Sequence, residues 1–265
     1  MPNTTHITYQ VASDPQHMAR VAAEYVTQAL EQAIAARGVA RFAISGGTTP
    51  RPYLAMLSDP ELPFYPRIRW DKIWLFWVDE RCVHPDSNES NYRMTKEALL
   101  SKVPIPSAQI FRMEGELDPE QAAARYESSI RNCFRLEGAE VPSFDLVALG
   151  MGPDGHTASL FPGTEALHEL TRLTVANHVP QKDMWRITLT APVINHGRKV
   201  FFLINGPDKA EMLHKVLLGP YDPESTPSQL VRPDTGSLFL IVDAAAATEL
   251  PAPDMKGVGT LEVTR

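Results

Sequence analysis

The chain has 265 residues, of which 43% are hydrophobic, and a formal net charge of −7 at pH 7. Its length allows a sizeable buried core, whereas its negative charge disfavours nucleic acid and anionic membrane surfaces as partners. The two cysteines, Cys82 and Cys133, stand far apart, so neither a disulfide framework nor a zinc site is indicated. A polar N-terminus and the lack of a long apolar run predict a cytoplasmic protein without a signal peptide or a membrane span.

Helices and strands alternate in the predicted order of elements. Helical spacing of apolar residues runs over 17–37 and stops at Gly38, and a short buried strand follows over 41–45. Further strands are predicted over 72–78, 144–150, 173–177, 186–190, 199–204 and 237–243. Further helices are predicted over 51–57, 91–103, 119–138 and 208–219. Apolar strands that alternate with helices indicate an α/β fold, in which helices cover both faces of a mostly parallel sheet.

No linker or internal repeat interrupts this alternation, so a single domain over 1–265 is expected. In such a sheet, ligands bind beyond the carboxyl ends of the strands. The loops expected there are SGGTTP (45–50), VDERC (78–82), GMGPDGH (150–156) and INGPDK (204–209). The proline-rich stretch 219–234 is expected to be a surface loop over the site.

Two of these loops suggest anion binding. In SGGTTP, backbone N–H groups and hydroxyls between a strand and a helix start can converge on a phosphate, although a tight turn with a Thr cap is the alternative. In INGPDK, Lys209 falls in the first turn of a helix, where the helix dipole disfavours a cation, so a bound anion would explain it. Lys209 and Arg186, which begins a strand, could equally be solvated surface residues.

The VDERC loop places Asp79, Glu80 and Arg81 at the carboxyl end of a buried strand, where charges are costly unless paired or solvated. One interpretation is a positioned carboxylate beside a guanidinium that binds an oxyanion or a phosphate. The other is a solvated turn with an Asp–Arg pair. Cys82 and His84 resemble a thiol nucleophile and its base, but no third group is seen to orient them.

The GMGPDGH loop has two interpretations. Its three glycines fit the dinucleotide-binding pattern G-x-G-x-x-G, but the motif lies past the midpoint of the chain, and Pro153 removes one N–H from the turn. The other interpretation is acid/base chemistry, in which the Asp154 carboxylate orients the His156 imidazole for proton transfer. A structural histidine remains the simpler alternative. The other histidines lack metal-ligand spacing, so neither a metal nor another cofactor is expected.

Taken together, these motifs resemble those of the 6-phosphogluconolactonases of the oxidative pentose phosphate pathway. The matching stretches are FAISGGTTP, WVDERCV, DSNESNY, FDLVALGMGPDGHTASLFPG, RITLT and INGPDKAEML. The resemblance implies a Rossmann-like, mostly parallel sheet that binds sugar phosphates and no dinucleotide. It also implies a cytosolic, metal-free enzyme that hydrolyses 6-phospho-D-glucono-1,5-lactone to 6-phosphogluconate.

The resemblance also implies roles for individual residues. His156 would be the general base that takes a proton from water, with Asp154 setting its orientation. Arg81 would face either the oxyanion or the phosphate, while Asp79 and Asn91 would order the pocket. The residues implied to hold the phosphate are Ser45, Gly46, Gly47, Thr48 and Lys209, together with Arg186.

Two other functions are compatible with these motifs. One is a sugar-phosphate isomerase or deaminase, but the deaminases of the wider group carry a Glu five residues after the motif His, where this chain has Phe161. The other is a non-catalytic sugar-phosphate sensor, which would normally need a DNA-binding unit and would not need Asp154 and His156 together. Both therefore remain alternatives to lactone hydrolysis.

Overall fold

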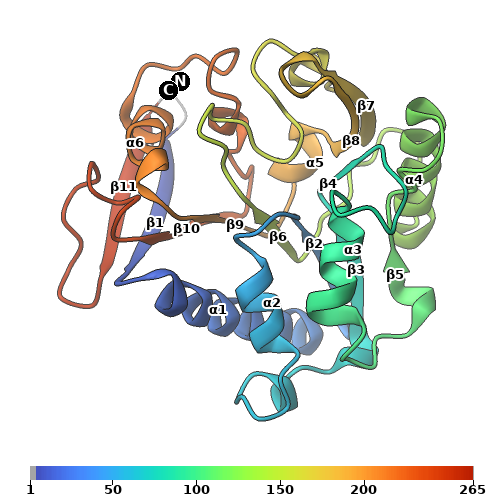
Figure 1. Ribbon diagram of the computed structural model, residues 1–265, viewed down its shortest axis with the longest axis horizontal. Coiled ribbons are helices and arrows are strands. Elements are labelled where there is room, and N and C mark those ends of the chain that lie inside the picture. The colour runs from blue at the N-terminus through green and yellow to red at the C-terminus, as the bar shows by residue number, and fades with distance from the viewer. Residues whose placement is uncertain (1–3, 265) are drawn as a thin grey trace.

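Eight strands form the central sheet of the computed structural model, which describes residues 4–264 (Figure 1). The strands are β1 (Thr4–Ala12), β2 (Ala40–Ile44), β3 (Ile73–Trp77), β5 (Ile110–Phe111), β6 (Leu146–Leu149), β9 (Lys199–Ile204), β10 (Ser237–Asp243) and β11 (Val258–Thr264). They lie in the order β11-β1-β10-β9-β6-β2-β3-β5, and all neighbours are parallel except β1 and β11. The predicted α/β fold with a mostly parallel sheet is confirmed.

Helices pack on both faces of this sheet. They are α1 (Pro15–Arg37), α2 (Arg51–Leu57), α3 (Asn91–Thr95), α4 (Pro119–Phe134), α5 (Ala191–Asn195) and α6 (Ala210–Leu218). In Figure 1, α1 and α2 lie below the sheet and α5 and α6 above it. Successive residues of a strand point to opposite faces, so Phe201 and Leu203 of β9 join the apolar cluster with α1 and α2, and Phe202 and Ile204 join the other cluster.

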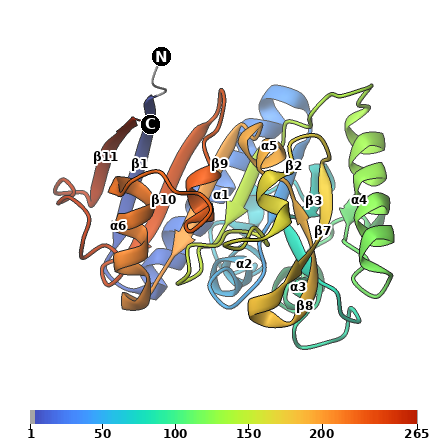
Figure 2. The ribbon, with the colours of Figure 1, turned by 90° about the horizontal axis from the view of Figure 1, so that it is seen from above.

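A second sheet, which is antiparallel, shares no strand with the first. It consists of β4 (Asp79–Arg81), β8 (Met184–Leu189) and β7 (Thr174–Val179), in that order, and two of these strands, β7 and β8, are labelled in Figure 2. The predicted strands 173–177 and 186–190 therefore exist but lie outside the central sheet, because an apolar pattern predicts burial and not the pairing partner. The predicted helix over 91–103 begins as expected, but its α-helical part ends at Thr95, and Lys96–Leu100 is a π-helical stretch.

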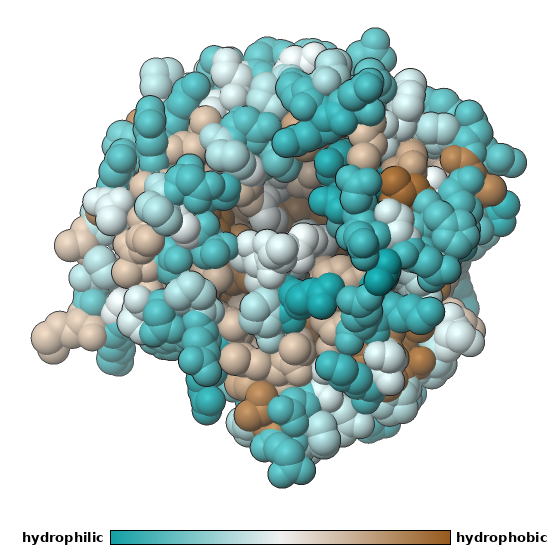
Figure 3. Space-filling model, in the orientation of Figure 1, coloured by the Kyte–Doolittle hydropathy of each residue, from teal (hydrophilic) through white to brown (hydrophobic). Residues whose placement is uncertain are grey.

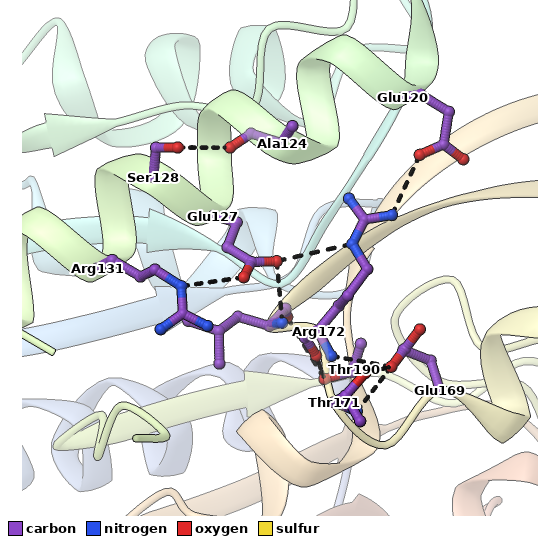
Figure 4. Close-up of polar contacts among 10 residues, drawn as sticks. Glu120, Ala124, Glu127, Ser128, Arg131, Glu169, Thr171, Arg172 and Thr190 are labelled. Carbon is purple, nitrogen blue, oxygen red and sulfur yellow. Dashed lines mark hydrogen bonds and ion pairs between the residues drawn. The ribbon is translucent and has the colours of Figure 1, made fainter. Parts of the chain in front are cut away.

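Ionic contacts attach α4 to the segment that leads into the second sheet (Figure 4). The largely buried Glu127 carboxylate accepts the Leu173 N–H at 3.1 Å and lies 3.9 Å from Arg172 Nε. Arg172 also donates to Glu120 at 3.2 Å. Because Leu173 directly precedes β7, these contacts help to hold the sheet that carries Arg186.

Candidate active site

A cleft of about 830 Å³, open to solvent, lies beyond the carboxyl ends of the central strands. The face seen in Figure 1 is hollowed near its middle (Figure 3). The cleft is lined by every predicted site residue except Asp154, namely Ser45, Gly46, Gly47, Thr48, Asp79, Arg81, Asn91, His156, Arg186 and Lys209. Strands distant in sequence thus bring the four predicted loops together, as the general rule for such sheets requires.

The SGGTTP loop connects β2 to α2 and closely approaches Asn91. Gly47 has a φ of 97°, a conformation that favours glycine. A Cβ at position 46 would lie only 1.8 Å from Asn91 Oδ1, so only glycine fits at this position of the loop. Thr49 Oγ1 donates to Asn205 Oδ1 at 2.7 Å and so joins this loop to the INGPDK loop that carries Lys209. The two loops suggested to bind an anion therefore form one wall.

Buried carboxylates organise the VDERC loop. Asp79 is 5% exposed and accepts hydrogen bonds from Ser159 Oγ at 2.8 Å and Asn91 Nδ2 at 3.3 Å. Neighbouring Glu80 accepts three backbone N–H groups, from Arg81, Asn91 and Tyr92, at 2.7–2.9 Å. Burial raises the pKa of Glu80, and these donors oppose that effect. Glu80 thus holds the start of α3 in place, a role that no sequence signal linked to residues 91 and 92.

The two arginines of the cleft keep donors that no described protein atom accepts. Arg81 Nη1 donates to the Glu89 carbonyl, while its Nε is buried and unpartnered among residues 4–264. Arg186 Nε is likewise unpartnered, and its Nη1 lies 3.9 Å from Asp79 Oδ2. Burial lowers the pKa of Arg186, and the charge of Asp79 opposes that shift. The two guanidinium groups that line the cleft supply positive charge and suit an anionic ligand.

The GMGPDGH loop forms a closed turn that joins Asp154 to His156. Asp154 Oδ1 lies 2.5 Å from His156 Nδ1, and the turn is closed by the Gly152 N–H, which donates to the His156 carbonyl at 2.9 Å. A Cβ at position 152 would lie 2.1 Å from His156 Nδ1, so this glycine leaves room for the ring. Burial raises the pKa of Asp154, but the hydrogen bond and charge of His156 outweigh it and lower that pKa overall.

The dinucleotide interpretation of this loop lacks its required helix. The β6 strand is followed by the turn and then by a short 3-10 helix at Glu165–His168, so no α-helix start faces the glycines.

The proline-rich stretch 219–234 contributes no residue to the cleft, contrary to expectation. Instead it supports the turn, because the Ser228 N–H donates to the Gly155 carbonyl at 2.8 Å.

The suggested thiol–imidazole pair lies outside the cleft. Cys82 and the exposed His84 line a separate surface depression. Burial raises the pKa of Cys82 to about 11, which leaves the thiol protonated near neutral pH. The structure therefore does not support Cys82 as a nucleophile.

Within residues 4–264, no group of three or more His, Cys, Asp or Glu side chains could hold a metal ion. No helix in that range is long and apolar enough to cross a membrane.

Comparisons with known proteins give consistent results. Residues 13–240 match the family model described as glucosamine-6-phosphate isomerases/6-phosphogluconolactonase. The chain is 42% identical over 227 residues to a 6-phosphogluconolactonase of Synechocystis, covering 85% of this chain and 90% of that protein. A rice protein named as a probable chloroplastic 6-phosphogluconolactonase is 34% identical, with 89% of this chain and 73% of that protein covered. The structure of 6-phosphogluconolactonase from Trypanosoma cruzi superposes with a TM-score of 0.80 at 29% identity, covering 91% and 96% of the two chains.

Proposed function

The chain belongs to the 6-phosphogluconolactonase family of lactone hydrolases, and we propose that His156 activates the water molecule that opens the lactone. The reaction converts 6-phospho-D-glucono-1,5-lactone to 6-phosphogluconate. The observation that carries the mechanism is the hydrogen bond between Asp154 and His156. The His156 imidazole lines the same cleft as Arg81 and Arg186, each of which has an Nε without a partner among residues 4–264.

The proton transfers follow from that hydrogen bond. An ionised Asp154 accepts a hydrogen bond from the protonated Nδ1 of His156, which leaves Nε2 as the basic atom of the ring. Nε2 takes a proton from water as the water oxygen attacks the lactone carbonyl carbon. The bond from that carbon to the ring oxygen then breaks, and the protonated His156 returns its proton from Nε2 to the ring oxygen, which leaves as a hydroxyl. The product is an open-chain carboxylic acid, which ionises at neutral pH.

The remaining residues of the cleft divide into two groups by position. The Ser45–Thr48 loop and Lys209 lie on loops joined by the Thr49–Asn205 hydrogen bond, which supports them as the phosphate-binding wall. We assign Arg186 to the carbonyl end, where negative charge develops on the oxygen, because its guanidinium and the His156 imidazole both contact the Phe161 ring. Asp79 lies 3.9 Å from Arg186 Nη1 and accepts a hydrogen bond from Asn91, which supports a role for this pair in ordering the pocket.

A coupled assay tests this mechanism. Glucose 6-phosphate is oxidised to the lactone, and oxidation of 6-phosphogluconate by a second enzyme is followed. The wild-type protein should remove the lag relative to buffer alone, which corrects for spontaneous hydrolysis. His156→Ala should lower the enzymatic rate by about 10²- to 10⁴-fold, the usual contribution of a general base. A fully active His156→Ala protein would rule the mechanism out.

The isomerase or deaminase alternative receives less support. The position five residues after His156 holds Phe161, which is fully buried and has no proton to exchange.

We further propose that a single domain over 1–265 carries the activity, because all four loops of the cleft meet on one fold; residues 1–3 and 265 lie outside the described part. A cytoplasmic location is proposed as well, although one similar rice protein is named as chloroplastic.

A further inference from the structure

Phe161 is a buried aromatic residue outside both apolar cores. Its side chain has no exposed surface, yet it belongs to neither of the two large apolar clusters. The other buried Phe, Tyr and Trp residues of the described chain all belong to one of them. The packing of Phe161 therefore has to be explained by its neighbours at the cleft.

Two of those neighbours are polar groups of the proposed mechanism. The Phe161 ring stacks on the His156 imidazole, with 3.9 Å between centroids and 15° between planes. The Arg186 guanidinium carbon lies 5.2 Å from the centroid of the same ring. One rigid side chain thus contacts both Arg186 and His156.

This arrangement restricts the imidazole in two directions. The imidazole turns about its Cβ–Cγ bond, and the hydrogen bond to Asp154 restrains this rotation through a single atom, Nδ1. Small rocking motions of the ring about that one contact change the hydrogen-bond length little. A flat aromatic surface at stacking distance removes that freedom, and the same surface supports a guanidinium through its π face.

We propose that Phe161 is a positioning residue that sets the plane of the His156 ring and the place of the Arg186 guanidinium relative to it. This proposal rests on the proposed role of His156 as the general base. Phe161 itself does not line the cleft and is not expected to touch the substrate.

Three variants separate positioning from ordinary core packing. Phe161→Leu keeps an apolar side chain and removes the ring. Phe161→Tyr keeps the ring but adds a hydroxyl to a fully buried site. Phe144→Leu is the matched control, since Phe144 is equally buried but packs on Phe76 and Phe134, within the core. All three should lower Tm, because each disturbs a close-packed interior.

Only Phe161→Leu should strongly change the kinetics. We expect a fall in kcat on the order of 10- to 100-fold, as for a small misplacement of a catalytic group. Any rise in KM should be about two- to fivefold, the size of one cation–π contact. Phe161→Tyr and Phe144→Leu should retain most of kcat. In NMR spectra, the imidazole protons of His156 should shift downfield in Phe161→Leu, because the ring current of Phe161 is lost.

The outcomes distinguish this proposal from the mechanism on which it rests. If His156→Ala is inactive but Phe161→Leu keeps its kcat, Phe161 is only a core residue. Equal losses of kcat in Phe161→Leu and Phe144→Leu would lead to the same conclusion. If His156→Ala is fully active, the proposed function fails first, whatever Phe161→Leu does.

Discussion

Asp154 Oδ1 lies 2.5 Å from His156 Nδ1, across a turn of three residues that the Gly152 N–H closes. The carboxylate and the imidazole are therefore neighbours in sequence as well as in space. Such a short connection leaves few ways for the pair to separate without disturbing the backbone. The following predictions test what this pair and its surroundings contribute.

Asp154→Asn should lower kcat by about 10- to 100-fold, less than His156→Ala, because the amide keeps the shape beside the imidazole but not the charge. The KM for the lactone should change little, since Asp154 does not line the cleft. Steady-state kinetics of both variants in the coupled assay check this. An Asp154→Asn protein with wild-type kcat would contradict the role assigned to the carboxylate.

The same pair predicts a pH dependence of stability. His156 lowers the pKa of Asp154 overall, so the ionised carboxylate stabilises the folded state above the pKa of an unfolded Asp, about 4. That stabilisation is lost as pH falls through the lower, folded-state pKa. The Tm difference between wild type and Asp154→Asn should therefore be constant near neutrality and shrink below about pH 4. A difference that grows towards acid pH would reverse the assigned sign.

Gly152→Ala should impair the pair sterically. Its Cβ would lie 2.1 Å from His156 Nδ1 and 2.5 Å from Asp154 Oδ1, so the ring must move. We expect kcat to fall on the order of 100-fold, as for a misplaced catalytic group. Coupled-assay kinetics check this, and a Gly152→Ala protein with wild-type kcat would show that the space at position 152 has no special importance.

Lys209→Ala should weaken binding of phosphorylated ligands. The Lys209 side chain is 17% exposed and lines the cleft, and its Nζ lies 2.6 Å from Asp208. Loss of a charged hydrogen bond predicts a rise of roughly 10- to 100-fold in the KM for the lactone and in the Ki of 6-phosphogluconate. Hydrolysis of unphosphorylated gluconolactone should be insensitive to the change. Lys182→Ala is the control, because Lys182 is exposed. If Lys209→Ala changed the kinetics of the two lactones equally, Lys209 would not belong to the phosphate site.

Cys82 should behave as a partly buried, protonated thiol rather than as a nucleophile. Burial raises its pKa to about 11, so the fraction of thiolate near pH 7 is very small. Alkylation of Cys82 by iodoacetamide, followed by mass spectrometry, should be slow at neutral pH and accelerate towards pH 11. Cys82→Ser should keep its activity. Rapid alkylation at neutral pH with parallel loss of activity would reinstate the thiol alternative.

The residues that line the cleft could be predicted from the sequence, but the side chains that hold them in place could not. Loops that follow parallel strands meet at one edge, so Ser45, His156 and Lys209 could be brought together without coordinates. Glu80 and Phe161 could not be assigned in this way, because their roles depend on partners in other elements. Glu80 holds residues 91 and 92, and Phe161 contacts Arg186, which lies on a strand of the second sheet. Pairings between distant elements leave no periodic signal in one sequence.

The hydrogen bond between Thr49 and Asn205 joins segments that are 156 positions apart. The two halves of the proposed phosphate wall therefore meet only when the N-terminal and C-terminal parts of the sheet have assembled. Contacts of such long range are formed late and slow the folding reaction. A partly folded chain should consequently have no affinity for 6-phosphogluconate. Recovery of binding during refolding from denaturant should lag behind recovery of helix signal, and the ligand should stabilise only the fully assembled protein.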